Sequence, residues 1–295
     1  MVEFEELPES CIATILSHTT PIDTCRLSVV SKTFHSASNS DDVWNRFLPS
    51  DSNLIDAIFS WYPYLANLPS KKAMFLALPN PPIIIDNGKK SFQLDKKSGK
   101  MFYMLSARSL TIACSARVKK WNTKLNSRFP KVAELCNVSW FEIRGTINSL
   151  SLSPNTHYAA YLVFKMNGAH GFENEPAELS VGVEDGRCIT KFVCLDPYFL
   201  YETNHRPHRA SRPTPKVVGL QRPSVRSDGW FEIEMGKFFN SSLEDKVVRM
   251  SVIQKKGHGK MENFFLEGIE VRPKEAYMSH SMLREKEKIW DFFLI

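Results

Sequence analysis

The sequence has no long apolar run. No stretch approaches the ~18 consecutive apolar residues that a membrane-spanning helix needs, which argues against such a helix. The acidic start, MVEFEELPES, also lacks the apolar core of a secretory signal. We therefore expect a protein of the cytoplasm or nucleus that has no membrane partner.

Closely spaced cysteines are absent as well. The six cysteines form no C-x-x-C pair, and the eight histidines do not cluster with metal-ligand spacing. Without an export signal, the cysteines are expected to be reduced thiols, several of them buried as small apolar side chains. Zinc would require tighter spacing with histidine nearby, so we expect no metal and no cofactor.

Catalytic motifs are missing too. The chain contains no G-x-S-x-G, no glycine-rich phosphate loop and no H-E-x-x-H. An active site would have to be assembled from residues that are distant in sequence. We therefore expect no enzyme and no catalytic residue.

Basic residues are scarce at the start of the chain. Residues 1–60 carry nine acids and three bases, a net charge of −6. Because the whole chain has a net charge of +6, residues 61–295 must carry +12. Opposite charges on two segments suggest two modules with different partners. Residues 204–226 hold six Arg or Lys and no acid, but four prolines and no interleaved aromatics favour a solvated loop over a nucleic-acid site.

Short helical patterns fill the first fifty residues. Pro8 suits the first turn of a helix, Thr20 to Asp23 forms a capping box, and Ser40 precedes a third helix. The apolar residues expected on the helix faces are Cys11, Ile12, Ile15 and Leu16, then Ile22, Cys25, Leu27, Val29 and Val30, then Val43, Trp44, Phe47 and Leu48. A module this small cannot bury all of them, which predicts a docking surface for another protein.

This segment resembles the F-box. The matching elements are Leu7-Pro8, Ile15-Leu16, Pro21, Leu27-x-x-Val30-Ser31-Lys32-x-Phe34 and Asp42-Val43-Trp44. The resemblance implies binding to the Skp adaptor of a cullin–RING ubiquitin ligase. The adaptor contacts that it implies are Leu7, Pro8, Ile12, Ile15, Leu16, Pro21 and Leu27. The alternative is a small helical domain whose apolar residues face one another. Trp44 fits either an interface or a core, and a core role is favoured.

A join of about thirty residues follows. Ser70 is expected to cap a short helix over residues 71–78, which the prolines at 79, 81 and 82 end. Two or three short helices of this kind would pack one module on the other. The rigidity of the join stays open at this point.

Alternating patterns replace the helical ones after Pro82. The candidate strands are Ser91–Asp95, Met101–Leu105, Val138–Thr146, His157–Met166, Leu179–Glu184, Ile189–Leu195, Trp230–Met235, Val247–Ile253 and Phe264–Val271. Nine short strands separated by turn residues predict an antiparallel β-sandwich. Within residues 158–164 both faces are apolar, as in a strand buried between two layers. Helix is expected only around residues 115–135.

This second half resembles the phloem-lectin family (phloem protein two, the Nictaba-type lectins), especially its plant members with a preceding F-box. The matching stretches include Tyr103-Met104-Leu105-Ser106-Ala107-Arg108, Trp140-Phe141-Glu142-Ile143-Arg144-Gly145, Ser153-Pro154-Asn155-Thr156, Asp228-Gly229-Trp230 and Glu267-Gly268-Ile269-Glu270-Val271-Arg272-Pro273. The resemblance covers residues 83–273. It implies a jelly-roll-like sandwich that binds N-acetylglucosamine oligomers or N-glycans.

The resemblance also implies a sugar site. The family has two tryptophans after the Ser-Ala-Arg motif; Trp121 matches the second, while Cys114 replaces the first. Losing a stacking platform costs on the order of 1–3 kcal/mol. Trp230 and Glu232 share one face of their expected strand and are further candidates to line a groove. A core position for Trp121 and a plain solvent face for Trp230 remain alternatives.

We therefore predict a multidomain α + β protein. It comprises an all-α F-box over residues 1–50, a helical linker over 51–82, an antiparallel jelly-roll-like lectin sandwich over 83–273 and a tail over 274–295. The leading hypothesis is the non-catalytic substrate-recognition subunit of a Skp–cullin–F-box ubiquitin ligase, with an unidentified target for which N-glycosylated proteins are one open class. The alternative is a lectin for N-acetylglucosamine oligomers or N-glycans. The role of the tail and the oligomeric state stay open.

Overall fold

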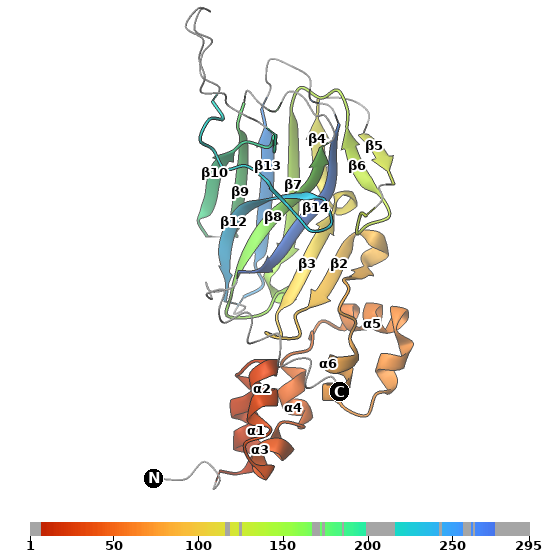
Figure 1. The fold of residues 1–295 in the computed structure, drawn as a ribbon, viewed down its shortest axis with the longest axis vertical. Helices are drawn as coiled ribbons and strands as arrows, with labels where there is room; N and C mark the ends of the chain where they lie inside the picture. The colour runs from red at the N-terminus through yellow and green to blue at the C-terminus, as the bar shows by residue number, and fades with distance from the viewer. Residues whose placement is uncertain are drawn as a thin grey trace, which may run out of the picture.

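A group of short helices lies at one end of the molecule, next to a two-layered β-sandwich (Figure 1). The computed structural model describes residues 7–115, 119–123, 126–166, 172, 175–184, 186–198, 216–241, 244–255, 261 and 263–274. The tail after Lys274 and most of the basic segment 204–226 lie outside these residues. None of the helices in these ranges is long and apolar enough to cross a membrane.

Six α-helices make up the first part of the chain. They are α1 Glu9–Ser17, α2 Pro21–Leu27, α3 Lys32–Ala37, α4 Asp41–Asn45, α5 Ser52–Trp61 and α6 Lys71–Ala77. The side chains of Thr20, Ser40 and Ser70 each accept a backbone N–H from the first turn that follows, which confirms these three predicted caps. Such caps matter because isolated helices of this length are marginal in water.

The second helix is shorter than its apolar pattern suggested. It ends at Leu27, and the hydroxyl of Ser31 caps the next helix by accepting the N–H of Phe34. Val29 and Val30 therefore lie in the turn between two helices, where they are 71% and 66% exposed. The prediction that they belong to the apolar face of the second helix was wrong, because that helix ends at Leu27 and the cap at Ser31 starts a new one.

Two antiparallel sheets form the rest of the described chain. Their strands are β1 Ile83–Ile85, β2 Lys90–Leu94, β3 Met101–Ser106, β4 Thr111–Cys114, β5 Lys119–Asn122, β6 Val132–Leu135, β7 Phe141–Asn148, β8 Thr156–Met166, β9 Ala177–Val183, β10 Cys188–Val193, β11 Ser224–Val225, β12 Phe231–Asn240, β13 Val247–Gln254 and β14 Phe264–Pro273. Short 3₁₀ turns occur at Pro63–Asn67, Asp86–Gly88, Ala107–Ser109 and Ser149–Ser151. The predicted sandwich is thus present.

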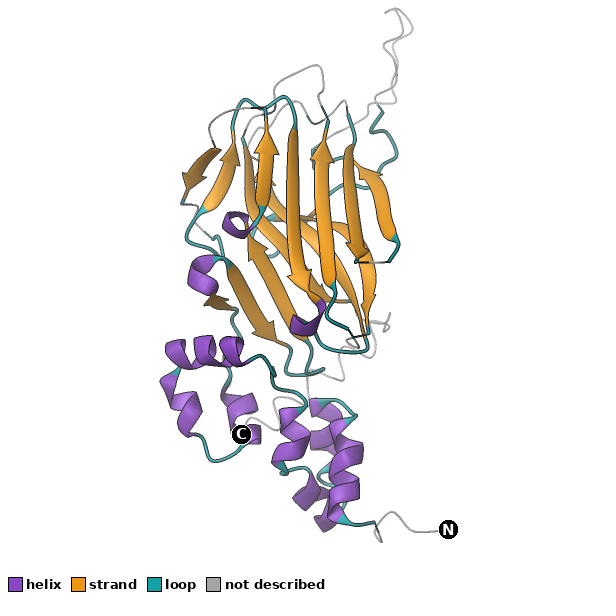
Figure 2. Ribbon diagram, turned by 180° about the vertical axis from the view of Figure 1, so that it is seen from behind, coloured by secondary structure: helices purple, strands orange, loops and turns teal. Residues whose placement is uncertain are grey.

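The larger sheet runs β1-β2-β3-β14-β8-β12-β11, with β6 also pairing with β14 and β5 pairing with β6. The smaller sheet runs β10-β9-β13-β7-β4. Figure 2 shows the two layers face to face, with the helices gathered at one end. The described residues around 115–135 form β5 and β6, so the helix expected there was wrong.

The core lies between the two sheets. Phe164 of β8 stacks on Phe264 of β14 with ring centroids 5.0 Å apart, and Phe264 meets Phe141 of β7 across the layers at 5.4 Å. Strand β8 is buried on both faces, as its apolar pattern predicted. Its outward face is covered by a second apolar cluster that includes Val163, Phe129 and Trp230.

The turn between β2 and β3 joins the sandwich to the helices. Lys96 in this turn donates hydrogen bonds to the carbonyl oxygens of Phe75 and Leu76 at the end of α6, and its ammonium group lies 4.9 Å from the centre of the Phe75 ring. A cation is favourable at the C-terminal end of a helix. Burial lowers the pKa of Lys96 to about 8. One continuous set of buried apolar side chains runs from Ile12 in α1 to Val271 in β14.

Gly99 offers a direct test of this packing. Its φ of +69° suits glycine, and an added Cβ would lie 3.1 Å from Pro21 and 3.2 Å from Phe47. Gly88 has a similar φ of +81° but nothing within 4 Å of the added Cβ. Both Gly99→Val and Gly88→Val should lose ~1–2 kcal/mol to backbone strain. Gly99→Val should lose a further ~1–3 kcal/mol by overpacking against the helices.

Urea unfolding of the full chain measures both changes. Gly88→Val serves as the matched control, because it carries the same backbone strain without the contact. Equal losses in the two variants would show that the turn does not pack tightly on the helices.

Candidate adaptor surface and ligand sites

Helix α1 carries an exposed apolar stripe. Pro8, Cys11 and Ile15 are exposed and fall three and four residues apart, which places them on one face of the helix. Ile15 is 41% exposed although it is a large apolar residue. The opposite face, with Ile12, Ala13 and Leu16, packs against α3 and α4. We call Pro8, Cys11 and Ile15 the α1 stripe.

The structure divides the seven residues that resemblance assigned to adaptor binding. Ile12 and Leu16 are 0% exposed, and Pro21 is buried beneath the β2–β3 turn. These three support the helical fold from within. Pro8 and Ile15 lie on the α1 stripe, while Leu7 and Leu27 are half-buried at the edge of the core. Val29 and Val30, in the turn after α2, add further exposed apolar surface.

Trp44 is a core residue, as favoured from the sequence. It is 0% exposed, and its indole N–H donates to the carbonyl oxygen of Ser38 at 2.7 Å. Its ring meets that of Phe75 in α6 with centroids 5.1 Å apart. The carboxylate of Asp41 accepts the N–H of Lys71 at 2.8 Å. Helices α1 to α4 and α6 therefore form one packed helical body.

Trp121 is an exposed ring on a short strand. It lies on β5 opposite Ala133 of β6, and it is 43% exposed. The neighbouring Asn122 donates a side-chain hydrogen bond to Glu134. Because successive side chains of a strand point to opposite faces, Asn122 and Glu134 lie on the other face of the β5–β6 pair from the ring. The exposed ring alone offers an apolar surface on which a sugar ring can stack. Cys114 lies on β4, in the other sheet.

Trp230 does not offer a ring face to a ligand in this structure. It is 0% exposed, and its indole N–H donates to the carbonyl oxygen of Asn126 at 2.8 Å. The ring packs with Phe129 and Val163 in the second apolar cluster. The segment 126–132 therefore covers the face that we expected to be open. The other face of β12 is core, as predicted, since Phe231, Ile233 and Met235 are buried.

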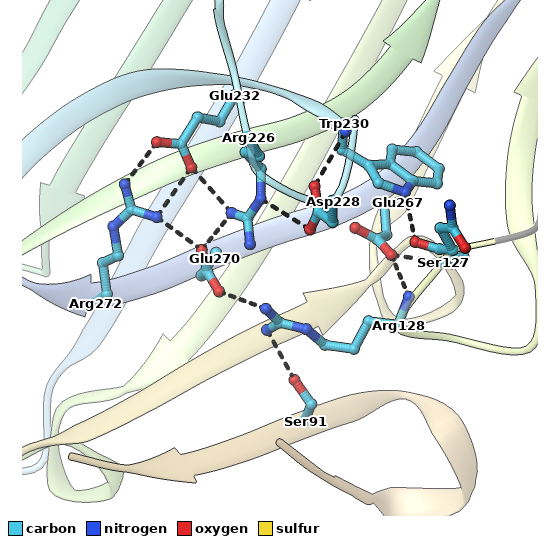
Figure 3. A network of polar contacts seen from close by, with 11 residues as sticks. Ser91, Ser127, Arg128, Arg226, Asp228, Trp230, Glu232, Glu267, Glu270 and Arg272 are labelled. Carbon is cyan, nitrogen blue, oxygen red and sulfur yellow. Dashed lines mark hydrogen bonds and ion pairs between the residues drawn. The ribbon is translucent and has the colours of Figure 1, made fainter. Parts of the chain in front are cut away.

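Glu232 belongs to a network of ion pairs on the outer side of the larger sheet (Figure 3). Arg272 donates to both of its carboxylate oxygens, at 2.7 and 2.9 Å, and Arg226 donates to one of them at 2.9 Å. Both oxygens of Glu232 are thus already bound. A sugar hydroxyl would have to displace a guanidinium group to reach them.

Glu270 lies at the centre of this network. It is 4% exposed and is bridged by Arg226 at 2.7 Å, Arg128 at 2.9 Å and Arg272 at 3.0 Å (Figure 3). Burial alone would raise the pKa of Glu270, but the three guanidinium groups hold that pKa below its usual value. Nearby, burial raises the pKa of Glu267, which accepts hydrogen bonds from Ser127 and from the N–H of Arg128. Glu270 and Arg272 are two residues apart on β14 and therefore share one face of that strand. This spacing is the sequence signal that could have indicated a charged outer face of the larger sheet.

The smaller sheet carries an open hollow on its outward face. The hollow has a volume of about 630 Å³. Figure 2 shows no described helix or strand lying over this face of the smaller sheet. Its floor includes the hydroxyls of Ser180 and Ser251, 2.7 Å apart, and its sides carry the ion pairs Arg144–Glu142 and Arg249–Glu184. Its described lining contains no aromatic ring, so it provides hydrogen-bonding groups without a stacking surface.

Comparison with known families matches both parts of the chain. The F-box domain family matches residues 4–46, and the Phloem protein 2 family matches residues 100–273. The F-box protein PP2-B15 of Arabidopsis thaliana is 40% identical over 288 residues, covering 91% of this chain and 96% of that protein. The F-box protein PP2-B10 of the same plant is 38% identical over 275 residues, covering 92% and 94% respectively.

Among solved structures, TmCBM61 in complex with beta-1,4-galactotriose is similar at a TM-score of 0.32 and 10% identity, covering 56% of this chain and 88% of that one. A likeness at this level carries no argument about ligands. The two family matches and the near full-length relatives are decisive. The chain belongs to the family of plant F-box proteins that carry a C-terminal phloem protein 2 domain.

Proposed function

We propose that this protein is the substrate-recognition subunit of a Skp–cullin–F-box ubiquitin ligase. The observation that carries the proposal is the α1 stripe, an exposed apolar surface on the helix at which the F-box begins. Exposed apolar surface on a small helical module favours burial against a partner. The seven assigned adaptor residues then have two roles: the exposed ones contact the Skp-type adaptor, and the buried ones hold the helices in place.

The proposed mechanism is positional. The sandwich binds a target, and the F-box holds that target near the ubiquitin-charged enzyme of the assembly, which raises the effective concentration of the target. No catalytic residue of this chain is required. The proposed division is a docking module over 1–50, a linker over 51–82 and a receptor over 83–273.

Co-expression with a Skp-type adaptor and a cullin tests the assembly. The full chain should co-elute with both in size-exclusion chromatography, and with the adaptor alone when the cullin is omitted. Elution of the full chain separately from the adaptor, at concentrations above 10 µM as an order-of-magnitude choice for a specific complex, would contradict the proposal.

Glycan recognition by the sandwich is a second candidate function, supported by the exposed ring of Trp121 on β5. We expect Trp121→Ala to weaken binding of N-acetylglucosamine oligomers by ~1–3 kcal/mol, because it removes the stacking face. Cys114→Trp should strengthen the same binding by adding a second platform. A glycan array followed by calorimetry on the full chain measures both.

The control for this pair is Trp140→Ala, because Trp140 is similarly exposed at 38% and lies outside β5 and β6. Binding that is absent, or equal in Trp121→Ala and the unmodified chain, would indicate that the target is recognised as a protein. Equal losses in both tryptophan variants would indicate a nonspecific effect.

A further inference from the structure

A polar cleft lies between the F-box helices and the lower end of the sandwich. It has a volume of about 530 Å³. One wall consists of residues 17–20 at the end of α1, Asp23 of α2, and Arg46 and Phe47 after α4. The opposite wall consists of residues 98–101 of the β2–β3 turn and residues 153–155 before β8. A molecule in this cleft would touch both parts of the chain.

Two basic side chains face this cleft from opposite walls. Arg46 comes from the helices and Lys100 from the sandwich. Neither forms an ion pair within the described residues, whereas Arg226 and Arg272 have carboxylate partners. Among the described residues, the amine of Lys100 donates only to the carbonyl oxygen of Pro154, at 3.4 Å. Burial lowers the pKa of Lys100, and the positive charge of Arg46 across the cleft lowers it further.

The remaining lining is compatible with an anion. Asp23 is the only acid in the described lining, and both of its oxygens are engaged, one by Arg26 at 3.0 Å and the other by the hydroxyl of Thr20 at 2.7 Å. The side chains of His18 and Asn155 also line the cleft and make no side-chain hydrogen bond within the described part of the chain. They are therefore available as further donors.

We propose that this cleft binds a small phosphorylated anion, held by Arg46 and Lys100 from opposite walls. A guanidinium group donates two parallel hydrogen bonds to phosphoryl oxygens, and an ammonium group binds phosphate as a point charge. An anion between the two cations replaces their repulsion with two attractions. The volume of the cleft leaves room for more than one phosphoryl group. Occupancy would tie the F-box helices to the sandwich.

Calorimetry and thermal unfolding of the full chain with sodium pyrophosphate test the proposal. Pyrophosphate should bind and raise the midpoint of unfolding, because a ligand that binds only the folded state stabilises it. Sodium chloride at matched ionic strength should not reproduce this shift. Arg46→Gln and Lys100→Gln should each weaken binding about tenfold or more. Lys32→Gln, an equal charge change on the exposed face of α3, should leave it unchanged.

The same measurements with sodium orthophosphate distinguish a ligand that has one phosphoryl group from a ligand that has two or more. Equal affinity for orthophosphate and pyrophosphate supports a site for a single phosphoryl group, and tighter pyrophosphate binding supports a ligand with two or more. No heat and no stabilisation with either salt would overturn the proposal. Binding that survives both Arg46→Gln and Lys100→Gln, with circular dichroism showing that the variants are folded, would also overturn it.

Discussion

Ile15→Asp should abolish co-purification of the chain with a Skp-type adaptor. Ile15 is 41% exposed and is the largest apolar side chain of the α1 stripe. A carboxylate at this position is hydrated in the free protein, but the complex would bury it without a hydrogen-bonding partner. Truncating a hot-spot residue of an interface costs ~2 kcal/mol or more. We therefore expect a loss of about 30-fold or more in affinity, measured by calorimetry or surface plasmon resonance.

One control variant and one further variant of the same surface complete this experiment. Val225→Asp makes a comparable change at a residue that is 70% exposed on β11 of the sandwich, and it should bind the adaptor normally. Leu7→Ala combined with Pro8→Ala tests the start of the same surface by truncation alone. Undiminished binding by Ile15→Asp and by the double variant would place the adaptor surface elsewhere on the chain.

Among the isosteric substitutions that we consider in the sandwich, Glu270→Gln should cause the largest loss in the free energy of unfolding. The substitution removes one negative charge from among Arg128, Arg226 and Arg272, and Glu270 is 4% exposed. Removing one partner of a buried ion pair leaves uncompensated charge and commonly costs ~3–5 kcal/mol. Urea unfolding of the full chain should show this loss as a lower midpoint with an unchanged slope.

Glu244→Gln is the matched control. Its carboxylate is exposed and pairs with Lys246 at 2.6 Å, so its removal should leave the midpoint unchanged within error. Equal midpoints for Glu270→Gln and the unmodified chain would show that the network does not stabilise the fold.

The same network predicts a dependence on pH. Because the pKa of Glu270 is lowered in the folded state, its contribution is complete above the ordinary glutamate pKa of about 4.3 and is lost as the pH falls below it. Glu267 acts in the opposite direction: burial raises its pKa, so protonation favours the folded state as the pH falls. Glu270→Gln should therefore flatten the acid limb of the stability profile, whereas Glu267→Gln should steepen it.

Sequence reasoning succeeded where the pattern is local and long. In β8, apolar residues on both faces indicated a strand between layers. The observed bounds of β8 and β14 differ from the expected ones by no more than two residues. It failed where pairing partners are distant. Strands β5 and β6 are four residues each, too short for alternation to separate them from helix, and only their pairing with each other and with β14 defines them.

The candidate site could be predicted only in part for a related reason. Alternation correctly placed Glu232 on the outer face of β12, opposite the core residue Ile233. It could not show whether that face meets water or another segment of the chain. Asn126 and Phe129, about a hundred residues earlier, cover Trp230. Likewise, the spacing in α1 gave an apolar stripe but not which of Ile12 and Ile15 faces outward.

The continuous core between helices and sandwich has a consequence for how a bound target meets ubiquitin. Because the helices and the sandwich share buried side chains, they do not rotate freely relative to each other. The receptor therefore holds a bound target in one position relative to the F-box. In the assembly that we propose, the distance to the charged enzyme is then bridged by loose segments of the target itself. Lysines on such segments would be modified first, and a compact target with all its lysines near the bound face would be a poor substrate.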